Sequence, residues 1–167
     1  MSVTPVARNP WADHPITVDL NNLDYGGWNA IKRLPNPSVN SRLLNRNGYC
    51  CLGLLCMSVF FSDKQLLDVA MPVGITTSYP PTPEQTELIT RLNTQLDRQD
   101  TAIINRDVLE SRSLADTCTA ANALAAINDS NKEGLTIPQK VALLNWIAAP
   151  IHITFTYQEP PCPSSLA

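Results

Sequence analysis

The chain has 167 residues, of which 44% are hydrophobic and 16% charged, and its formal net charge at pH 7 is −3. This length suits a single domain with its own hydrophobic core, and the acidic balance argues against a dedicated nucleic-acid-binding protein. The longest apolar run, residues 49–61, is too short to cross a bilayer, and the opening residues MSVTPVARNPW lack the apolar segment of a signal peptide. We therefore expect a soluble cytoplasmic protein.

The first part of the chain predicts one strand and two helices. In residues 16–20, ITVDL, apolar side chains alternate as they do in a half-buried strand. Residues 28–34 suit a short helix that ends at the proline-containing sequence LPNPSVN. Residues 49–61 are apolar on every side, which indicates a buried helix, although the length also allows a buried strand.

Two helices are predicted in the middle of the chain. Thr82 and Gln85 can form a capping box, in which each side chain accepts a hydrogen bond from the other residue's backbone N–H. An apolar stripe follows at helical spacing, made of Leu88, Ile89, Leu92 and Leu96. Residues 113–128 are rich in Ala and Leu and predict the second of these helices.

A further helix is predicted after residue 136. Thr136 and Gln139 repeat the capping box, and Pro150 is expected to end the helix. Its core face is expected to hold apolar residues at helical spacing, namely Val141, Leu144, Ile147 and Ala148. Trp146 adjoins this stripe, and we assign it to the core as well.

The end of the chain predicts a strand followed by a stiff arm. In residues 151–157, IHITFTY, the apolar and polar positions alternate strictly, which is typical of a half-buried strand. The tail 159–167 is rich in proline and cannot continue a sheet. We therefore predict an α+β fold, a compact helix-dominated single domain over residues 1–158 with short strands near both ends and a Pro-rich C-terminal arm.

Three of the five cysteines lie in residues 48–56, GYCCLGLLC, and this stretch has three interpretations. A metal site is disfavoured because the paired C-x2-C spacing of zinc sites is missing, so we predict no metal and no cofactor. Cys50 opens the predicted helix, whose dipole would lower a thiol pKa, and His152 is a candidate general base. These two are only weak catalytic candidates, because no third residue completes the set. The favoured interpretation is that the cysteines are small, reduced core residues.

GYCCLGLLC resembles the YCCLGVLC signature of small accessory proteins encoded by tailed phages and prophages. That family has a Trp-containing helix before the signature and an LNDSG-type segment after it. Here the corresponding stretches begin at Trp28 and at Leu124, which opens LAAINDS, so the resemblance spans about residues 28–148. The turn after Ser130 is longer than in the family, and the strand and arm after Pro150 are additions. The resemblance implies a phage gene product that acts on host physiology or defence in the host cell cytoplasm.

The segment between Asp24 and Asp63 contains no acidic residue but four cations, Lys32, Arg33, Arg42 and Arg46. Arginine grips phosphate with two parallel hydrogen bonds, and the amides that open the Cys50 helix would add donors. We therefore predict that these four residues bind a small anionic ligand. Trp28, next to this basic segment, is the predicted stacking partner.

Three functions from different classes remain. The first is a non-catalytic counter-defence protein that binds and sequesters a small anionic ligand, such as a nucleotide immune signal, and that forms a homo-oligomer through its arm. The second is a protein-binding inhibitor or virion-associated interaction module. The third is a cysteine hydrolase that uses Cys50 and His152. We favour the first because the sequence offers no convincing catalytic set.

Overall fold

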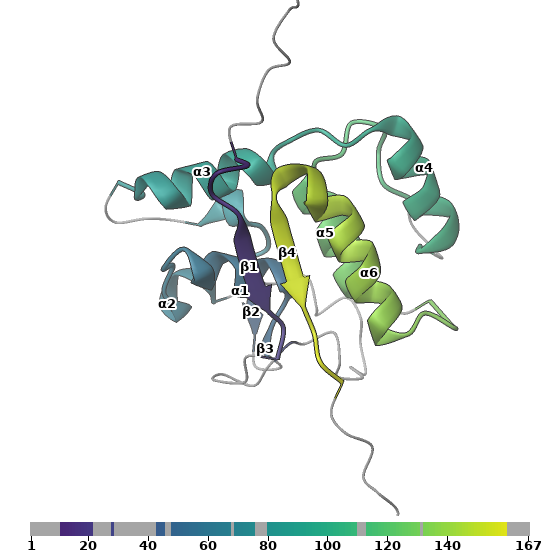
Figure 1. Ribbon diagram of the computed structural model, residues 1–167, viewed down its shortest axis with the longest axis horizontal. Helices are drawn as coiled ribbons and strands as arrows, with labels where there is room; N and C mark the ends of the chain where they lie inside the picture. Colours follow the sequence, from purple (N-terminus) through teal and green to yellow (C-terminus); the bar gives the residue numbers. More distant parts are fainter. Residues whose placement is uncertain are drawn as a thin grey trace, which may run out of the picture.

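The computed structural model describes residues 11–21, 28, 43–45, 48–67, 69–75, 80–109, 113–130 and 132–159. Helices dominate, and a small parallel sheet joins strands from near the two ends of the chain, so the predicted α+β class is confirmed (Figure 1). The predicted helix at 28–34, except for Trp28, and nearly all of the C-terminal arm lie outside the described residues.

The parallel sheet consists of β1 (Ile16–Asp19) and β4 (Ile153–Thr156), and Val18 lies opposite Phe155 in its register. Both strands were predicted from alternation, and both Val18 and Phe155 are buried. The second strand begins later than predicted, because residues 149–151 form the short 3-10 helix η4 (Ala149–Ile151) around Pro150. His152 then turns the chain in a left-handed conformation, with φ 55°.

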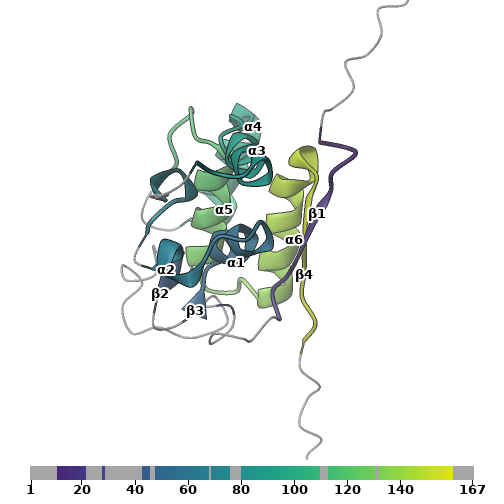
Figure 2. The same cartoon turned by 90° about the vertical axis from the view of Figure 1, so that its left-hand side faces the viewer.

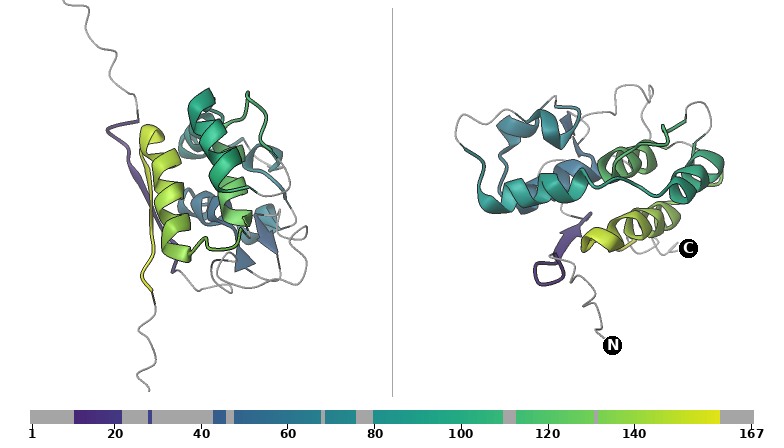
Figure 3. Two further views of the ribbon diagram at one scale, coloured as in Figure 1. Left: turned by 90° about the vertical axis from the view of Figure 1, so that its right-hand side faces the viewer. Right: turned by 90° about the horizontal axis from the view of Figure 1, so that it is seen from above.

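The inner face of the sheet is covered by helices. The longest of the described helices, α6 (Ile137–Ala148), packs against β4 on one side and against α5 (Ala120–Asp129) on the other (Figures 2 and 3). The helix α1 (Cys51–Ser58) contacts both β1 and α5. The core therefore lies where α1, α5, α6 and the sheet meet.

The apolar stretch predicted at 49–61 is indeed a buried helix, although a shorter one. Tyr49 belongs instead to β3 (Gly48–Tyr49), which pairs with β2 (Leu44–Asn45) in a short antiparallel hairpin. Inside α1, Gly53 lies against the backbone of Leu43, and a Cβ atom on Gly53 would fall 1.9 Å from the Leu43 carbonyl oxygen. This glycine is required because the chain before the hairpin crosses α1 at backbone distance.

Capping boxes begin the helices where the sequence predicts them. Thr82 and Gln85 exchange hydrogen bonds at the start of α3 (Pro83–Leu92), and Thr136 and Gln139 do the same at α6. The helix predicted at 113–128 begins later, at α5, because Thr119 and Asn122 form a further capping box there.

Two of the described helices, α4 (Arg98–Asp107) and α2 (Asp63–Leu66), were not predicted from the sequence. The helix α4 buries only Thr101 and Ile104, and its sequence contains few apolar residues. The short helix α2 is held by a capping box of Ser62 and Gln65, and the 3-10 turn η3 (Pro72–Gly74) follows it.

Arg91 of α3 is fully buried and forms hydrogen bonds with the segments that precede β1 and β4. Its guanidinium donates to the His14 carbonyl before β1 at 2.6 Å and to the Ile151 and His152 carbonyls before β4 at 3.4 Å. The Trp11 ring lies over the same guanidinium, 5.9 Å from its carbon. A buried charge needs such partners, because desolvation is costly without them.

We predict that Gly53→Ala lowers the free energy of unfolding by about 3 kcal/mol or more, because α1 and the backbone at Leu43 must move apart. Gly74→Ala is the matched control, since its new methyl would meet Val69 at an ordinary 3.7 Å and the change should stay within about 1 kcal/mol. Urea denaturation of the two variants measures both values. Equal losses would contradict the close crossing at Gly53.

Candidate functional site

Three stretches that lie far apart in the sequence, at Trp28, at the start of α1 and at the end of α5, meet at the buried side chain of Asn128. Its Oδ1 accepts a hydrogen bond from Trp28 Nε1 at 2.6 Å and one from the Cys51 backbone N–H at 2.9 Å. Its Nδ2 donates to Asp129 at 3.0 Å. Residues a hundred positions apart are thereby joined by one amide.

Lys140 of α6 adds a fourth connection to the same point. Its Nζ donates to the Asn128 carbonyl oxygen at 3.0 Å, and only 5% of the residue is exposed. Burial lowers the pKa of Lys140, while the nearby Asp129 carboxylate acts in the opposite direction. The end of α5 therefore connects to Trp28, to the start of α1 and to α6.

The cysteines of α1 are buried free thiols, as the packing interpretation predicts. Cys50 caps the helix, and its sulfur accepts a hydrogen bond from the Gly53 N–H at 3.3 Å. Burial nevertheless raises the pKa of Cys50 to about 12, and burial also raises the pKa values of Cys51 and Cys56. The expectation that the helix start lowers the Cys50 pKa is therefore wrong, because desolvation outweighs the cap.

His152 does not activate this thiol. No hydrogen bond joins His152 and Cys50, both of which lie in the described part of the chain. The backbone carbonyl of His152 instead accepts hydrogen bonds from Arg91 and from the Ile16 N–H at the start of β1. Cys50 is therefore a protonated thiol at neutral pH, whereas a cysteine nucleophile has to be a thiolate.

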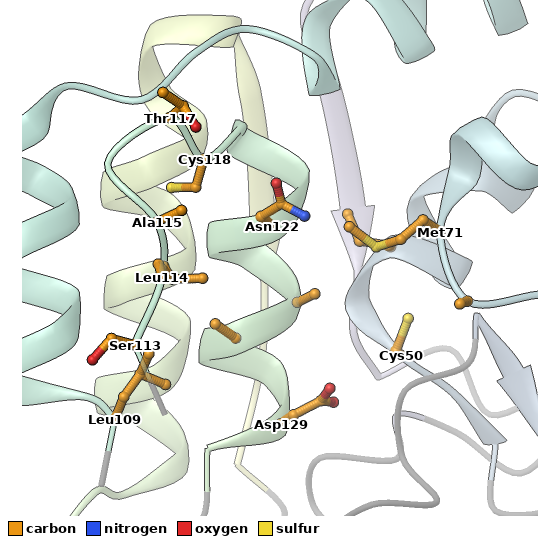
Figure 4. Close-up of a pocket in the computed structure, with 14 residues that line it drawn as sticks. Cys50, Met71, Leu109, Ser113, Leu114, Ala115, Thr117, Cys118, Asn122 and Asp129 are labelled. Carbon is orange, nitrogen blue, oxygen red and sulfur yellow. The ribbon is translucent and has the colours of Figure 1, made fainter. Parts of the chain in front are cut away.

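A groove runs along the outer face of α5, and we call it the α5 groove. It encloses about 560 Å³, within the usual range for small-molecule sites. The floor is α5, where Ala125 and Ala126 line the groove. Leu109 and residues 113–118 form one wall, and Cys50 and Met71 lie on the other side of α5 (Figure 4).

The two ends of the α5 groove differ in polarity. Asn122, in the first turn of α5, presents an amide, and Asp129, at the last turn, presents a carboxylate; both point into the groove (Figure 4). Their separation of seven positions in the sequence corresponds to about 10 Å along the helix axis. Because a helix is positive at its N-terminus, the Asn122 end favours an anion, and the Asp129 end favours an N–H donor.

Of the predicted ligand-binding residues, the structure describes only Trp28. Lys32, Arg33, Arg42 and Arg46 lie outside the described residues, so their contacts stay a prediction. Trp28 is fully buried, donates to Asn128 and packs edge-on against Tyr157, so its ring is enclosed by the protein. The prediction that Trp28 stacks on a ligand therefore needs correction, since the tryptophan is part of the core.

Two related expectations are also wrong. The first backbone N–H groups of α1 were expected to bind an anion. Those of Cys51 and Gly53 instead donate to Asn128 and Cys50 inside the core. Trp146, assigned to the core, is 37% exposed, because it lies beside the apolar stripe of α6 and not within it.

Sequence reasoning missed Asn122 as a groove residue. The Thr119-x-x-Asn122 spacing is a capping signal that could have placed it in a first helical turn. Its place in a groove depends on Met71, on Leu109 and on residues 113–118, whose positions no local pattern reveals.

No group of three or more His, Cys, Asp or Glu residues suited to a metal ion occurs in the described ranges. Within the same ranges, no helix is long and apolar enough to cross a membrane. Comparisons with protein-family models, with curated proteins and with solved structures find no match to this chain.

We predict that Asn128→Leu destabilises the protein by about 3 kcal/mol, because two buried donors, Trp28 Nε1 and the Cys51 N–H, lose their acceptor. Trp28→Phe removes one of those donors and should cost less. In the double variant the cost should be smaller than the sum, which a double-mutant cycle in urea measures. Strict additivity would contradict the shared acceptor.

The raised thiol pKa values predict a pH dependence of stability. A thiol whose folded pKa exceeds its ordinary value of 9.0 stabilises the fold fully below that value and progressively less as pH rises toward the folded pKa. The free energy of unfolding should therefore decline above about pH 9, and less steeply in Cys50→Ala. A Cys50 that alkylates as fast in the native protein as in urea at neutral pH would contradict its burial.

Proposed function

We propose that the protein binds and sequesters a small anionic ligand of the nucleotide class without transforming it. The observation that carries this proposal is the α5 groove, with largely apolar walls and a few polar groups at defined positions. Such a combination is typical of small-molecule sites. The resemblance to phage accessory proteins suggests a role in the host cell, namely capture of a nucleotide signal of host defence.

The polarity of the groove floor fits a nucleotide in one orientation. A phosphate would lie at the Asn122 end, near the positive end of α5, and an N–H edge of the base would face Asp129. Ala125 and Ala126 are small and leave room for a flat ring on the floor between the two ends. The opposite orientation would bring phosphate to a carboxylate, which is electrostatically unfavourable.

The basic segment would supply the remaining positive charge. Arg42 precedes Leu43 in the sequence, and the Leu43 backbone bonds Val69 at 2.7 Å and Cys50 at 3.1 Å. Val69 is followed by Ala70, and both Ala70 and Cys50 line the groove. The sequence neighbour of Arg42 is thus attached to one wall of the groove, which supports a role for this arginine.

The structure bears differently on the two alternative functions, a cysteine hydrolase and a protein-binding module. A cysteine hydrolase is disfavoured by the buried, protonated Cys50 thiol. A protein-binding module is favoured by one observation, the 87% exposure of Phe60, which adopts a left-handed backbone conformation with φ 68°. A bulky residue held in this conformation at the surface is uncommon. We retain this function as the second candidate.

We predict that a panel of nucleotides raises the melting temperature of the protein, because a ligand that binds only the folded state stabilises it. The bound nucleotide should return chemically unchanged when the protein is denatured, as mass spectrometry can establish. A converted nucleotide would point to catalysis, and the absence of any melting shift would favour the protein-binding module.

The double variant Arg42→Ala/Arg46→Ala should abolish nucleotide binding with little loss of thermal stability. The matched control is Arg98→Ala/Arg106→Ala, which removes the same charge from exposed arginines of α4 and should bind normally. Titration calorimetry compares the two. Equal losses would mean that net charge, and not a defined site, governs binding.

A further inference from the structure

A second cavity adjoins the α5 groove, and we call it the side chamber. It has a volume of about 190 Å³ and is lined mainly by η3, by Ile89 and Leu92 of α3, by the α3 C-cap Asn93, and by the first turn of α5. Met71 and Asn122 line both cavities. The two cavities are therefore neighbours with these two side chains between them, and we call this boundary the neck.

The orientation of the Asn122 amide at this neck is determined by its own hydrogen bonds. Its Oδ1 accepts from the Thr119 backbone N–H at 3.1 Å and from the Thr119 hydroxyl at 2.9 Å. The oxygen is therefore committed to the helix cap, and the amide nitrogen points toward Met71 (Figure 4). No described residue accepts a hydrogen bond from this nitrogen. The neck thus carries a fixed donor, next to the positive end of α5.

The side chamber has the size for one ring system. An apolar protein cavity of about 150 Å³ is known to hold benzene, and this chamber is somewhat larger. Ile89 and Leu92 offer apolar contact, while Met71 has the flexible side chain that adapts a wall to different shapes.

We infer that the α5 groove and the side chamber together bind a ligand with two ring systems joined by an anionic linker, a dinucleotide being the simplest such molecule. This inference rests on the proposed function and deepens it. One base lies in the groove over Ala125 and Ala126, and the second lies in the side chamber. The linking phosphodiester passes the neck, where Asn122 Nδ2 donates to it. A ligand that fills both spaces gains from their linkage, because its second contact is intramolecular.

The test compares the four common 5′-mononucleotides with the corresponding 5′-phosphorylated homodinucleotides by titration calorimetry. With the unaltered protein, the best dinucleotide should bind on the order of a hundredfold tighter than its mononucleotide. Asn93→Trp, at an exposed position of the side-chamber rim, should remove this advantage and leave the mononucleotide affinity unchanged. Thr86→Trp, at an exposed α3 position outside both cavities, is the control and should change neither affinity.

A further variant tests the neck. Asn122→Asp keeps an acceptor for Thr119, so the helix cap and the melting temperature should persist, but it replaces the donor with a negative charge. It should lose most of the dinucleotide affinity. Mononucleotide binding without any gain for dinucleotides, or a gain that survives both Asn93→Trp and Asn122→Asp, would overturn the two-ring inference alone. No binding of either class would overturn the proposed function as well.

Discussion

One buried amide, the side chain of Asn128, is the interaction on which the rest of this structure depends. The side-chain oxygen of Asn128 accepts two hydrogen bonds, from Trp28 and from the first residue of α1. The backbone carbonyl of Asn128 accepts a third hydrogen bond, from Lys140. All of these groups are buried, so each would otherwise lose its bonds to water without replacement. The helices α1, α5 and α6 are therefore held together at one point by polar groups whose geometry allows little variation.

The same point defines one end of the α5 groove. Cys50 and Asp129 line the groove and are the direct neighbours of Cys51 and Asn128, which are joined by a hydrogen bond. The distance between the two sides at this end is thus set by a buried contact. Binding residues supported in this way lose little freedom on ligand binding. In the proposed binding site the thiol-rich helix would act as a rigid support, and its cysteines need no reactivity for that role.

Local patterns in the sequence predict much of the fold. The alternation in β1 and β4 and the capping boxes at Thr82 and Thr136 depend on neighbouring residues only, and they predicted these elements correctly. The helix α4 was missed because it buries few apolar side chains. The parallel pairing of the two strands joins opposite ends of the chain, and no local pattern carries that information. The same reason explains the misplaced Trp28 and Trp146, since their surroundings come from distant segments. The groove was missed likewise, because its floor and its walls belong to three separate parts of the chain.

Hydrogen–deuterium exchange with and without a saturating nucleotide tests the central claim most directly, because it locates the ligand on the whole chain. Binding in the α5 groove predicts slower exchange in residues 113–118 and at Ala70 and Met71, which border the groove on its two sides, with little change in α6 and β4. Protection confined to α6, to β4 or to the surface around Phe60 would contradict a ligand site on α5.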